Sequence, residues 1–298
     1  MNKVIVVTGA GGGLGKQFSL AAAAEGAHVV VNDPGVSLDG TGGDSSLAKQ
    51  VVDEIRANGG SAVANTDSVA SWDSAHAIID SAVSSFGRID GVINNAGIVR
   101  DRMFFNMSES EWRAVIDVHL NGTFFVSRAA AEHFKNQKSG RYVHITSTSA
   151  LIGNVAQSNY AAAKLGIVSL SRTIASDMSR YGVKSNCIAP FAWSRMTASI
   201  PTDTPEQQRR VDALKKMTAN KVAPLAMYLL SDRSKVTGQV FAVRANEIFL
   251  FSQNRPIRTA VSADGWTQDG IADYLIPSLE PSFHPLDKTA DVISWDPQ

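Results

Sequence analysis

Short apolar runs alternate with longer amphipathic segments over most of the chain. The short runs are rich in β-branched residues, whereas the longer segments repeat apolar positions every three or four residues, which is typical of helices. Strands are expected over residues 4–7, 28–32, 61–65, 89–93, 141–146, 184–189 and 239–243. Helices are expected over residues 14–25, 44–58, 71–86, 120–135, 159–181 and 222–230, with a short one opened by the capping box Ser108-x-x-Glu111. This alternation predicts a mostly parallel sheet with helices on both faces.

The pattern loosens after residue 190. Residues 191–221 mix polar and apolar positions irregularly, which indicates a mobile segment with one short helix near 206–217. Prolines interrupt the chain repeatedly beyond residue 245, where one helix near 267–275 is expected. The stretch from residue 245 on is too short and too often interrupted by proline to form a hydrophobic core of its own. We therefore expect a single doubly wound, Rossmann-like α/β domain over residues 1–244. A proline-rich extension over residues 245–298 should pack on this domain or on a neighbouring subunit.

The first strand runs directly into a glycine cluster and then into an alanine-rich helix. Residues 4–15 read VIVVTGAGGGLG. Glycines permit a sharp turn and a close approach of a pyrophosphate, and the following helix offers free N–H groups to it. Asp33 ends the second apolar run, where an acid can bind the adenosine ribose. The stretch predicts a dinucleotide site, although a merely flexible turn is the alternative.

Composition excludes several classes of partner. The formal net charge is zero, so nothing favours nucleic acid or an anionic membrane. The one cysteine, Cys187, cannot form an intrachain disulfide. The chain reaches its first strand within a few residues and has no run of membrane-spanning length. We expect a cytoplasmic protein, and the six histidines show no spacing typical of a metal site.

Tyr160 and Lys164 lie four residues apart on a predicted helix, and Ser147 ends a predicted strand. A tyrosine with a pKa of about 10 is a poor acid–base catalyst at neutral pH, and a nearby ammonium favours the phenolate. The pair is therefore suited to proton transfer. Each residue has a plainer reading, since Ser147 is one of four successive hydroxyl residues and Asn121-Gly122 resembles a helix end.

These motifs together resemble the short-chain dehydrogenase/reductase family. The turn Thr8-Gly9-x-x-x-Gly13-x-Gly15 and the tetrapeptide Asn94–Gly97 match its coenzyme motifs. The resemblance implies reversible hydride transfer between NAD and a secondary alcohol or ketone. It implies four catalytic residues: Asn121, Ser147, Tyr160 and Lys164. It implies a cofactor site made by Gly9, Gly13, Leu14, Gly15, Asp33, Asp67, Ser68, Asn95, Ala96, Gly97, Tyr160, Lys164 and Ile188.

The resemblance also assigns roles. Tyr160 exchanges a proton with the substrate oxygen, Ser147 hydrogen-bonds that oxygen, and Asn121 supports a water. Lys164 binds the nicotinamide ribose and lowers the pKa of the tyrosine. Asp33 would repel a 2′-phosphate, so NAD is expected rather than NADP. Family members commonly pair two helices across a two-fold axis, and a homo-dimer or homo-tetramer is expected.

Within the family, four segments resemble the (3R)-hydroxyacyl-CoA dehydrogenase unit of peroxisomal multifunctional enzyme type 2. They are residues 31–33, 59–65, 99–102 and 194–197. The substrate is then an acyl-CoA or a steroid-like alcohol, and basic residues in 191–221 would meet CoA phosphates. The family's glycines are absent after Pro190 and after Arg244, near the substrate end. A hydroxysteroid dehydrogenase, a 3-oxoacyl-carrier-protein reductase and a non-catalytic dinucleotide-sensing scaffold remain alternatives.

Overall fold

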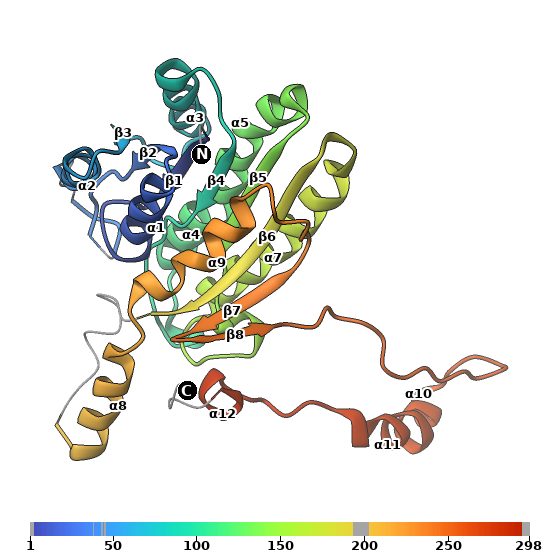
Figure 1. Cartoon of the computed structure of the whole chain (residues 1–298). Helices are drawn as coiled ribbons and strands as arrows, with labels where there is room; N and C mark the ends of the chain where they lie inside the picture. The colour runs from blue at the N-terminus through green and yellow to red at the C-terminus, as the bar shows by residue number, and fades with distance from the viewer. Residues whose placement is uncertain (1–2, 38, 43, 45, 193–202, 294–298) are drawn as a thin grey trace.

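One eight-stranded sheet runs through the computed structural model, which describes residues 3–293 except 38, 43, 45 and 193–202 (Figure 1). The order of the strands is β3-β2-β1-β4-β5-β6-β7-β8. The strands are β1 (Val4–Thr8), β2 (His28–Asn32), β3 (Ser61–Asn65), β4 (Gly91–Asn94), β5 (Gly140–Ile145), β6 (Val183–Phe191), β7 (Val240–Arg244) and β8 (Glu247–Leu250). All pairs up to β7 are parallel. The predicted doubly wound α/β fold is confirmed.

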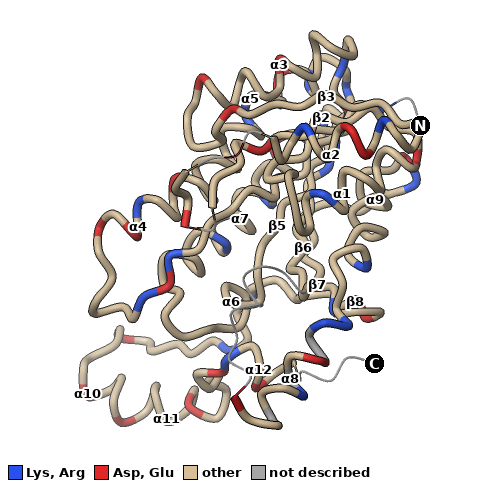
Figure 2. Tube along the Cα trace, turned by 90° about the vertical axis from the view of Figure 1, so that its left-hand side faces the viewer, with Lys and Arg blue, Asp and Glu red and all other residues tan. Residues whose placement is uncertain are grey.

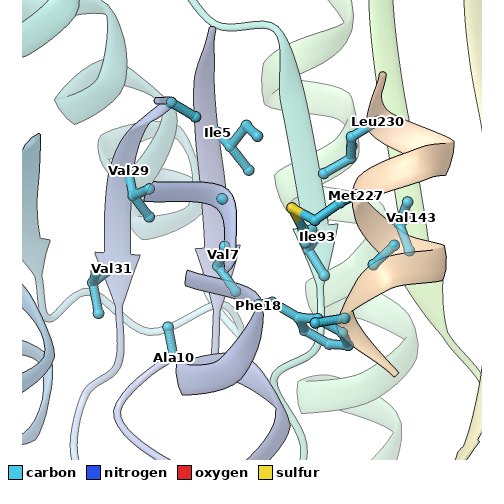
Figure 3. Packing of buried hydrophobic residues seen from close by; sticks show 14 of the residues in the cluster. Ile5, Val7, Ala10, Phe18, Val29, Val31, Ile93, Val143, Met227 and Leu230 are labelled. Atoms are coloured by element: carbon cyan, nitrogen blue, oxygen red, sulfur yellow. The ribbon is translucent and has the colours of Figure 1, made fainter. Parts of the chain in front are cut away.

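Helices cover both faces of the sheet. The apolar core on one face is closed by α1 (Gly13–Ala24), α2 (Ser46–Ala57) and α9 (Ala223–Leu230). The core on the other face is closed by α3 (Trp72–Phe86), α5 (Gly122–Gln137) and α7 (Ser158–Asp177). Figure 3 shows Phe18 of α1 and Met227 of α9 over the β-branched residues of the central strands. The sheet is thus buried on both faces by helices.

The strand order reverses between β1 and β4. Because β2 lies on one side of β1 and β4 on the other, the loops after these strands part at their carboxyl ends. Ligands of open α/β sheets bind in the crevice that this parting leaves. The glycine turn after β1 therefore lies where a site is expected.

The sheet does not end at β7, contrary to the prediction. A tight turn at Ala245 leads into β8, which pairs antiparallel with β7 from Phe241↔Leu250 to Arg244↔Glu247. Ala245 has φ 52°, a conformation that favours glycine. The hairpin adds four residues to the sheet beyond the boundary that we expected at residue 244.

A second difference concerns α5. The sequence predicted two separate helices, but α4 (Glu109–Ile116), a π-helical turn η2 (Asp117–Asn121) and α5 follow one another without a break. The predicted capping box is present, with Glu111 N–H bonded to Ser108 and Ser108 N–H bonded to Glu111. The reading of Asn121-Gly122 as a helix end is therefore wrong.

Beyond β8, residues 251–293 form an arm that leaves the body and returns to it (Figure 1). Its apolar side chains are largely exposed: Val261, Tyr274 and Leu286 are 86, 75 and 102% exposed. Its far end is tied to the body, since Thr289 N–H donates to the carbonyl of Gly153 at 3.0 Å. Its helical pieces are α10 (Gln268–Gly270), η6 (Ile271–Leu275), α11 (Ile276–Leu279), η7 (Glu280–Ser282) and α12 (Thr289–Val292).

The remaining short elements are η1 (Phe104–Asn106), α6 (Thr148–Leu151), η3 (Ser179–Tyr181), α8 (Pro205–Lys215) and η5 (Ala219–Lys221). No helix in the described part of the chain has the length and apolar content that a bilayer crossing requires. Acidic and basic positions are both scattered over the trace in Figure 2, and their numbers balance in the zero net charge.

Candidate active site

The glycine turn after β1 packs directly against the loop after β4. A Cβ on Gly15 would lie 2.1 Å from the Gly9 carbonyl oxygen, and one on Gly9 would lie 2.8 Å from Ala96 Cα. The Asn95 amide donates to the carbonyls of Thr8 and Gly9, both at 3.0 Å. Larger residues at these positions would separate the two loops. The turn is therefore built for close approach of backbone to a ligand, as a pyrophosphate requires.

Asp33 lies beside this turn at the end of β2. Its carboxylate accepts the N–H groups of Gly11 and Gly35, both at 2.7 Å. It lines a cavity of about 420 Å³ whose other charged residues are Asp39, Asp117 and Arg100. The expected cofactor residues Gly9, Ser68, Asn95, Ala96 and Gly97 line the same cavity.

A second hollow of about 340 Å³ continues from the first. The two share Gly12, Asn95, Gly97 and Ile98, so they form one elongated cleft. The second is lined by Gly13, Leu14, Ser147, Tyr160 and Lys164. Three of the four catalytic residues expected from the sequence thus lie at one end of this cleft, and Asp33 lies at the other end. A dinucleotide, with an adenosine half and a reactive half, fits this arrangement.

Lys164 is buried, with 3% of its surface exposed. Its ammonium donates to the carbonyl of Ile145 at 2.7 Å, and it lies 5.6 Å from the centre of the Tyr160 ring. Burial lowers the pKa of Lys164 to about 7. The ammonium is thus held at the end of β5, facing the tyrosine one helical turn away.

Tyr160 differs from the expectation in its acidity. Burial raises the pKa of its phenol to about 12, and the hydrogen bond with Ser147 lowers it only in part. The expected lowering by Lys164 is not seen. Ser147 also caps α6, since its hydroxyl accepts Ser149 N–H at 3.2 Å. The structure therefore holds Tyr160 as a protonated donor beside Ser147.

Four expected residues do not line the cleft. The Asn121 amide donates to the Asp117 carboxylate at 2.8 Å. The Asp67 carboxylate accepts the Asn65 amide at 2.7 Å, and the Ile188 carbonyl accepts Thr146 N–H at 2.8 Å. Gly15 acts through packing, as described above. Roles for Asn121, Asp67 and Ile188 at a bound ligand stay predictions.

His119 is a cleft residue that the sequence reasoning missed. It comes from the π-helical turn, and its ring meets that of Tyr160 edge-on at 5.2 Å between centres. Its Nε2 lies 2.8 Å from the Ile98 carbonyl, its Nδ1 has no hydrogen-bond partner, and it lines the cleft. Burial, followed by the charge of Lys164, lowers the pKa of His119 to about 3, so the ring is neutral. The π-helical turn that orients it gave no signal in the sequence.

Part of the predicted substrate segment lies outside the described residues. These are Trp193, Arg195, Met196 and Ile200, together with Ser194 and Thr197. Met217, which belongs to the same segment, is described and is only 1% exposed, and it does not line the cleft.

Comparison with known proteins identifies the family. The family model described as short chain dehydrogenase matches residues 3–204. The chain belongs to this family. It is 42% identical over 284 residues to the mouse peroxisomal multifunctional enzyme type 2, covering 91% of this chain and 37% of that protein. It is 41% identical over 280 residues to a hydroxyacyl-CoA dehydrogenase of Mycobacterium tuberculosis, covering 90% of this chain and 84% of that one.

A solved structure agrees over almost the whole chain. The crystal structure of a short-chain dehydrogenase from Mycobacterium avium superposes with a TM-score of 0.80 at 41% identity, covering 95% of this chain and 96% of that one. The protein is thus an oxidoreductase that uses a nicotinamide dinucleotide and a small-molecule substrate. Among the described residues, no three His, Cys, Asp or Glu side chains are grouped as metal ligands.

Proposed function

We propose that the protein transfers a hydride between NAD(H) and a 3-hydroxyacyl-CoA. The observation that carries this proposal is the single cleft with Asp33 at one end and Ser147, Tyr160 and Lys164 at the other. Two relatives that match nine-tenths of the chain support the substrate, since one is named a hydroxyacyl-CoA dehydrogenase and the other a peroxisomal multifunctional enzyme.

The chain's own residues account for the proton. When bound, the nicotinamide ring supplies or accepts the hydride. The Tyr160 hydroxyl donates a proton to the carbonyl oxygen during reduction and accepts it back during oxidation. Ser147 hydrogen-bonds the same oxygen, and the Lys164 ammonium stabilises the phenolate that reduction leaves. The raised pKa of Tyr160 keeps the phenol in its donor form at neutral pH.

Three acids in the adenosine-side cavity support NAD over NADP. Asp33, Asp39 and Asp117 line it, against Arg100 as the one described cation. A 2′-phosphate would bring a further negative charge among them. We expect kcat/KM with NADH to exceed that with NADPH, and steady-state kinetics with both cofactors measures it. Equal or better kcat/KM with NADPH would refute this choice.

Basic residues at the end of α8 support a CoA ester. Lys215 and Lys216 are exposed, and CoA phosphates approaching them would bind more weakly as salt increases. The experiment compares kcat/KM for a 3-hydroxyacyl-CoA and a hydroxysteroid at low and high salt, in wild type and in Lys215→Ala/Lys216→Ala. We expect acyl-CoA turnover to fall with salt and with the double substitution.

The alternatives predict other results. A hydroxysteroid dehydrogenase would have a kcat/KM for the steroid that is higher by orders of magnitude and does not change with salt concentration. A 3-oxoacyl-carrier-protein reductase would prefer the carrier-bound acyl group to its CoA ester. A dinucleotide-sensing scaffold would bind NADH and turn over no alcohol.

A further inference from the structure

A loop between β2 and α2 roofs the adenosine-side cavity. We call the described residues 34–37, 39–42 and 44 the flap. Its base is closed, because Gly35 N–H donates to Asp33 and Asp44 N–H donates to the Gly35 carbonyl at 2.8 Å. Pro34, Val36 and Ser37 face the cavity from this side. The flap is therefore a preformed loop above the half of the cleft that Asp33 marks.

The tip of the flap is stiff by itself. Ser37 N–H donates to the Thr41 carbonyl at 2.9 Å, and Thr41 donates its N–H and hydroxyl to the Asp39 carboxylate at 3.0 and 2.7 Å. These side-chain bonds, led by that from Ser37, lower the pKa of Asp39 to about 2. The carboxylate is thus occupied within the tip, and the backbone carbonyl of Asp39 is left to face outward.

That carbonyl is held by Arg100. The Arg100 Nε donates to the Asp39 carbonyl at 2.8 Å, and this is the hydrogen bond that joins the tip to the loop after β4 in the described part of the chain. Beside it, a Cβ on Gly40 would come within 3.2 Å of the Ile98 side chain. Arg100 itself lines the cavity.

The other end of Arg100 is anchored to the catalytic helix. Its carbonyl accepts the Asn159 amide at 3.0 Å, and Asn159 is fully buried next to Tyr160 at the start of α7. The same amide also donates to the Glu111 carbonyl at 3.1 Å. Arg100 therefore links the flap to the start of α7, the helix that carries Tyr160 and Lys164.

We propose that Arg100 is a positioning residue for the dinucleotide, which fixes the flap over the adenosine half and thereby slows cofactor release without taking part in hydride transfer. This inference rests on the proposed function, because it needs a dinucleotide in the cleft. The bond uses Nε and not the guanidinium tip. Glutamine places an amide nitrogen the same number of bonds from Cα, so Arg100→Gln keeps the donor and removes the charge.

The test measures dissociation constants of NADH, NADPH, ADP-ribose and reduced nicotinamide mononucleotide, together with hydride transfer in single turnovers at saturating NADH. Losing a hydrogen bond from a charged donor is expected to weaken binding about tenfold or more. Arg100→Ala should weaken NADH and ADP-ribose by about that factor, and leave the mononucleotide and the single-turnover rate within about twofold. Arg100→Gln should restore most of the affinity. Arg102→Ala is the matched control, since Arg102 leaves the same loop to pair with Glu111.

Several outcomes overturn the inference. If Arg100→Ala bound NADH as tightly as the wild type, the flap would not depend on the Arg100 hydrogen bond to hold the dinucleotide. An equal loss for the mononucleotide would make Arg100 a general structural residue. A loss in Arg100→Gln as large as in Arg100→Ala, greatest for NADPH, would make Arg100 a phosphate ligand. Failure of the wild type to bind NADH or ADP-ribose would instead refute the proposed function.

Discussion

At the scale of single residues, burial shifts the pKa values of Tyr160 and Lys164 more than their charges shift one another. Tyr160 is held as a phenol and Lys164 is brought to a pKa of about 7, each chiefly by burial. The cleft thus keeps a proton on the tyrosine and a marginal charge on the lysine.

Removing the phenol hydroxyl should stop the proton path. We expect Tyr160→Phe to lower kcat by about 10²–10⁴-fold, the range of general acid catalysis. NADH binding should change little, because the role proposed for the hydroxyl is at the substrate oxygen. Pre-steady-state kinetics and NADH titration measure the two quantities, and a variant retaining most of the wild-type kcat would contradict the mechanism.

Ala156 offers a test of backbone strain beside the cleft. It has φ 63°, and its carbonyl accepts Arg102 N–H at 2.8 Å. Left-handed geometry costs a residue with a Cβ about 1–2 kcal/mol. Ala156→Gly should therefore raise the free energy of unfolding by up to about 1 kcal/mol, measured by urea denaturation. Ala161→Gly, inside α7, is the opposite control and should destabilise; a loss of stability in both would mean that Ala156 is not strained.

At the scale of elements, the π-helical turn decides which side chain enters the cleft. Such turns occur often at functional sites. The turn directs His119 towards Tyr160 and Ile98, whereas Asn121, two residues later, is bonded to Asp117. The histidine is thus a neutral support for the loop after β4 and the tyrosine ring.

The two residues make a matched pair. We expect His119→Ala to lower kcat at least tenfold, because Ile98 loses its partner and Tyr160 loses a packed ring. Asn121→Ala should cost less than about threefold, as its bond to Asp117 lies at the surface of the helix. Steady-state kinetics of both variants measures the two effects, and the reverse ranking would support the catalytic role predicted for Asn121.

Most of the sheet and the three cleft residues were predictable, for physical reasons. Buried parallel strands are uniformly apolar, and Tyr160 and Lys164 are fixed by helical periodicity. The strand β8 was missed because two of its four residues, Ile248 and Leu250, are more than half exposed and its turn has Ala245 in place of a glycine. The π-helical turn was missed because an element of five residues is too short to be recognised from the period of apolar positions.

At the scale of the whole molecule, a buried polar chain crosses the sheet. His144 is fully buried, with Nδ1 3.0 Å from the Asn94 amide and Nε2 3.1 Å from the Ser185 hydroxyl. The Asn94 amide also donates to Ser127 at 2.9 Å. The hydrogen bonds among these side chains are complete only while the His144 ring is neutral, because one ring nitrogen has to accept.

Acid should therefore destabilise the fold. Burial lowers the pKa of His144 to about 3, and the unfolded value is about 6.5. The unfolded state binds the proton first as pH falls, so stability is complete above about 6.5 and declines towards about 3, by about 1.4 kcal/mol per pH unit. Urea denaturation at several pH values measures the free energy of unfolding. This free energy should fall less steeply with decreasing pH in His144→Gln than in the wild type. His284→Gln, at an exposed position, should not change the slope.

The arm makes a prediction about assembly. Its exposed apolar residues have no cover within the described part of this chain, and we propose that the protein forms a homo-dimer or homo-tetramer in which the arm packs on a neighbour. Tyr274→Asp/Leu286→Asp should lower the mass measured by light scattering at micromolar concentration. Asn254→Asp, elsewhere in the arm, should not; a monomeric wild type would refute the proposal.

Asp33 also bears on any attempt to redesign cofactor preference. Its two oxygens accept the N–H groups of Gly11 and Gly35, so the acid that we propose to bind the ribose also joins the glycine turn to the flap. Exchange for a neutral residue would leave both N–H groups to find new partners, at about 1–3 kcal/mol each where they are desolvated. We therefore expect that a change from the proposed NAD preference to NADP requires a second substitution that replaces these bonds, so that a single exchange at Asp33 does not achieve it.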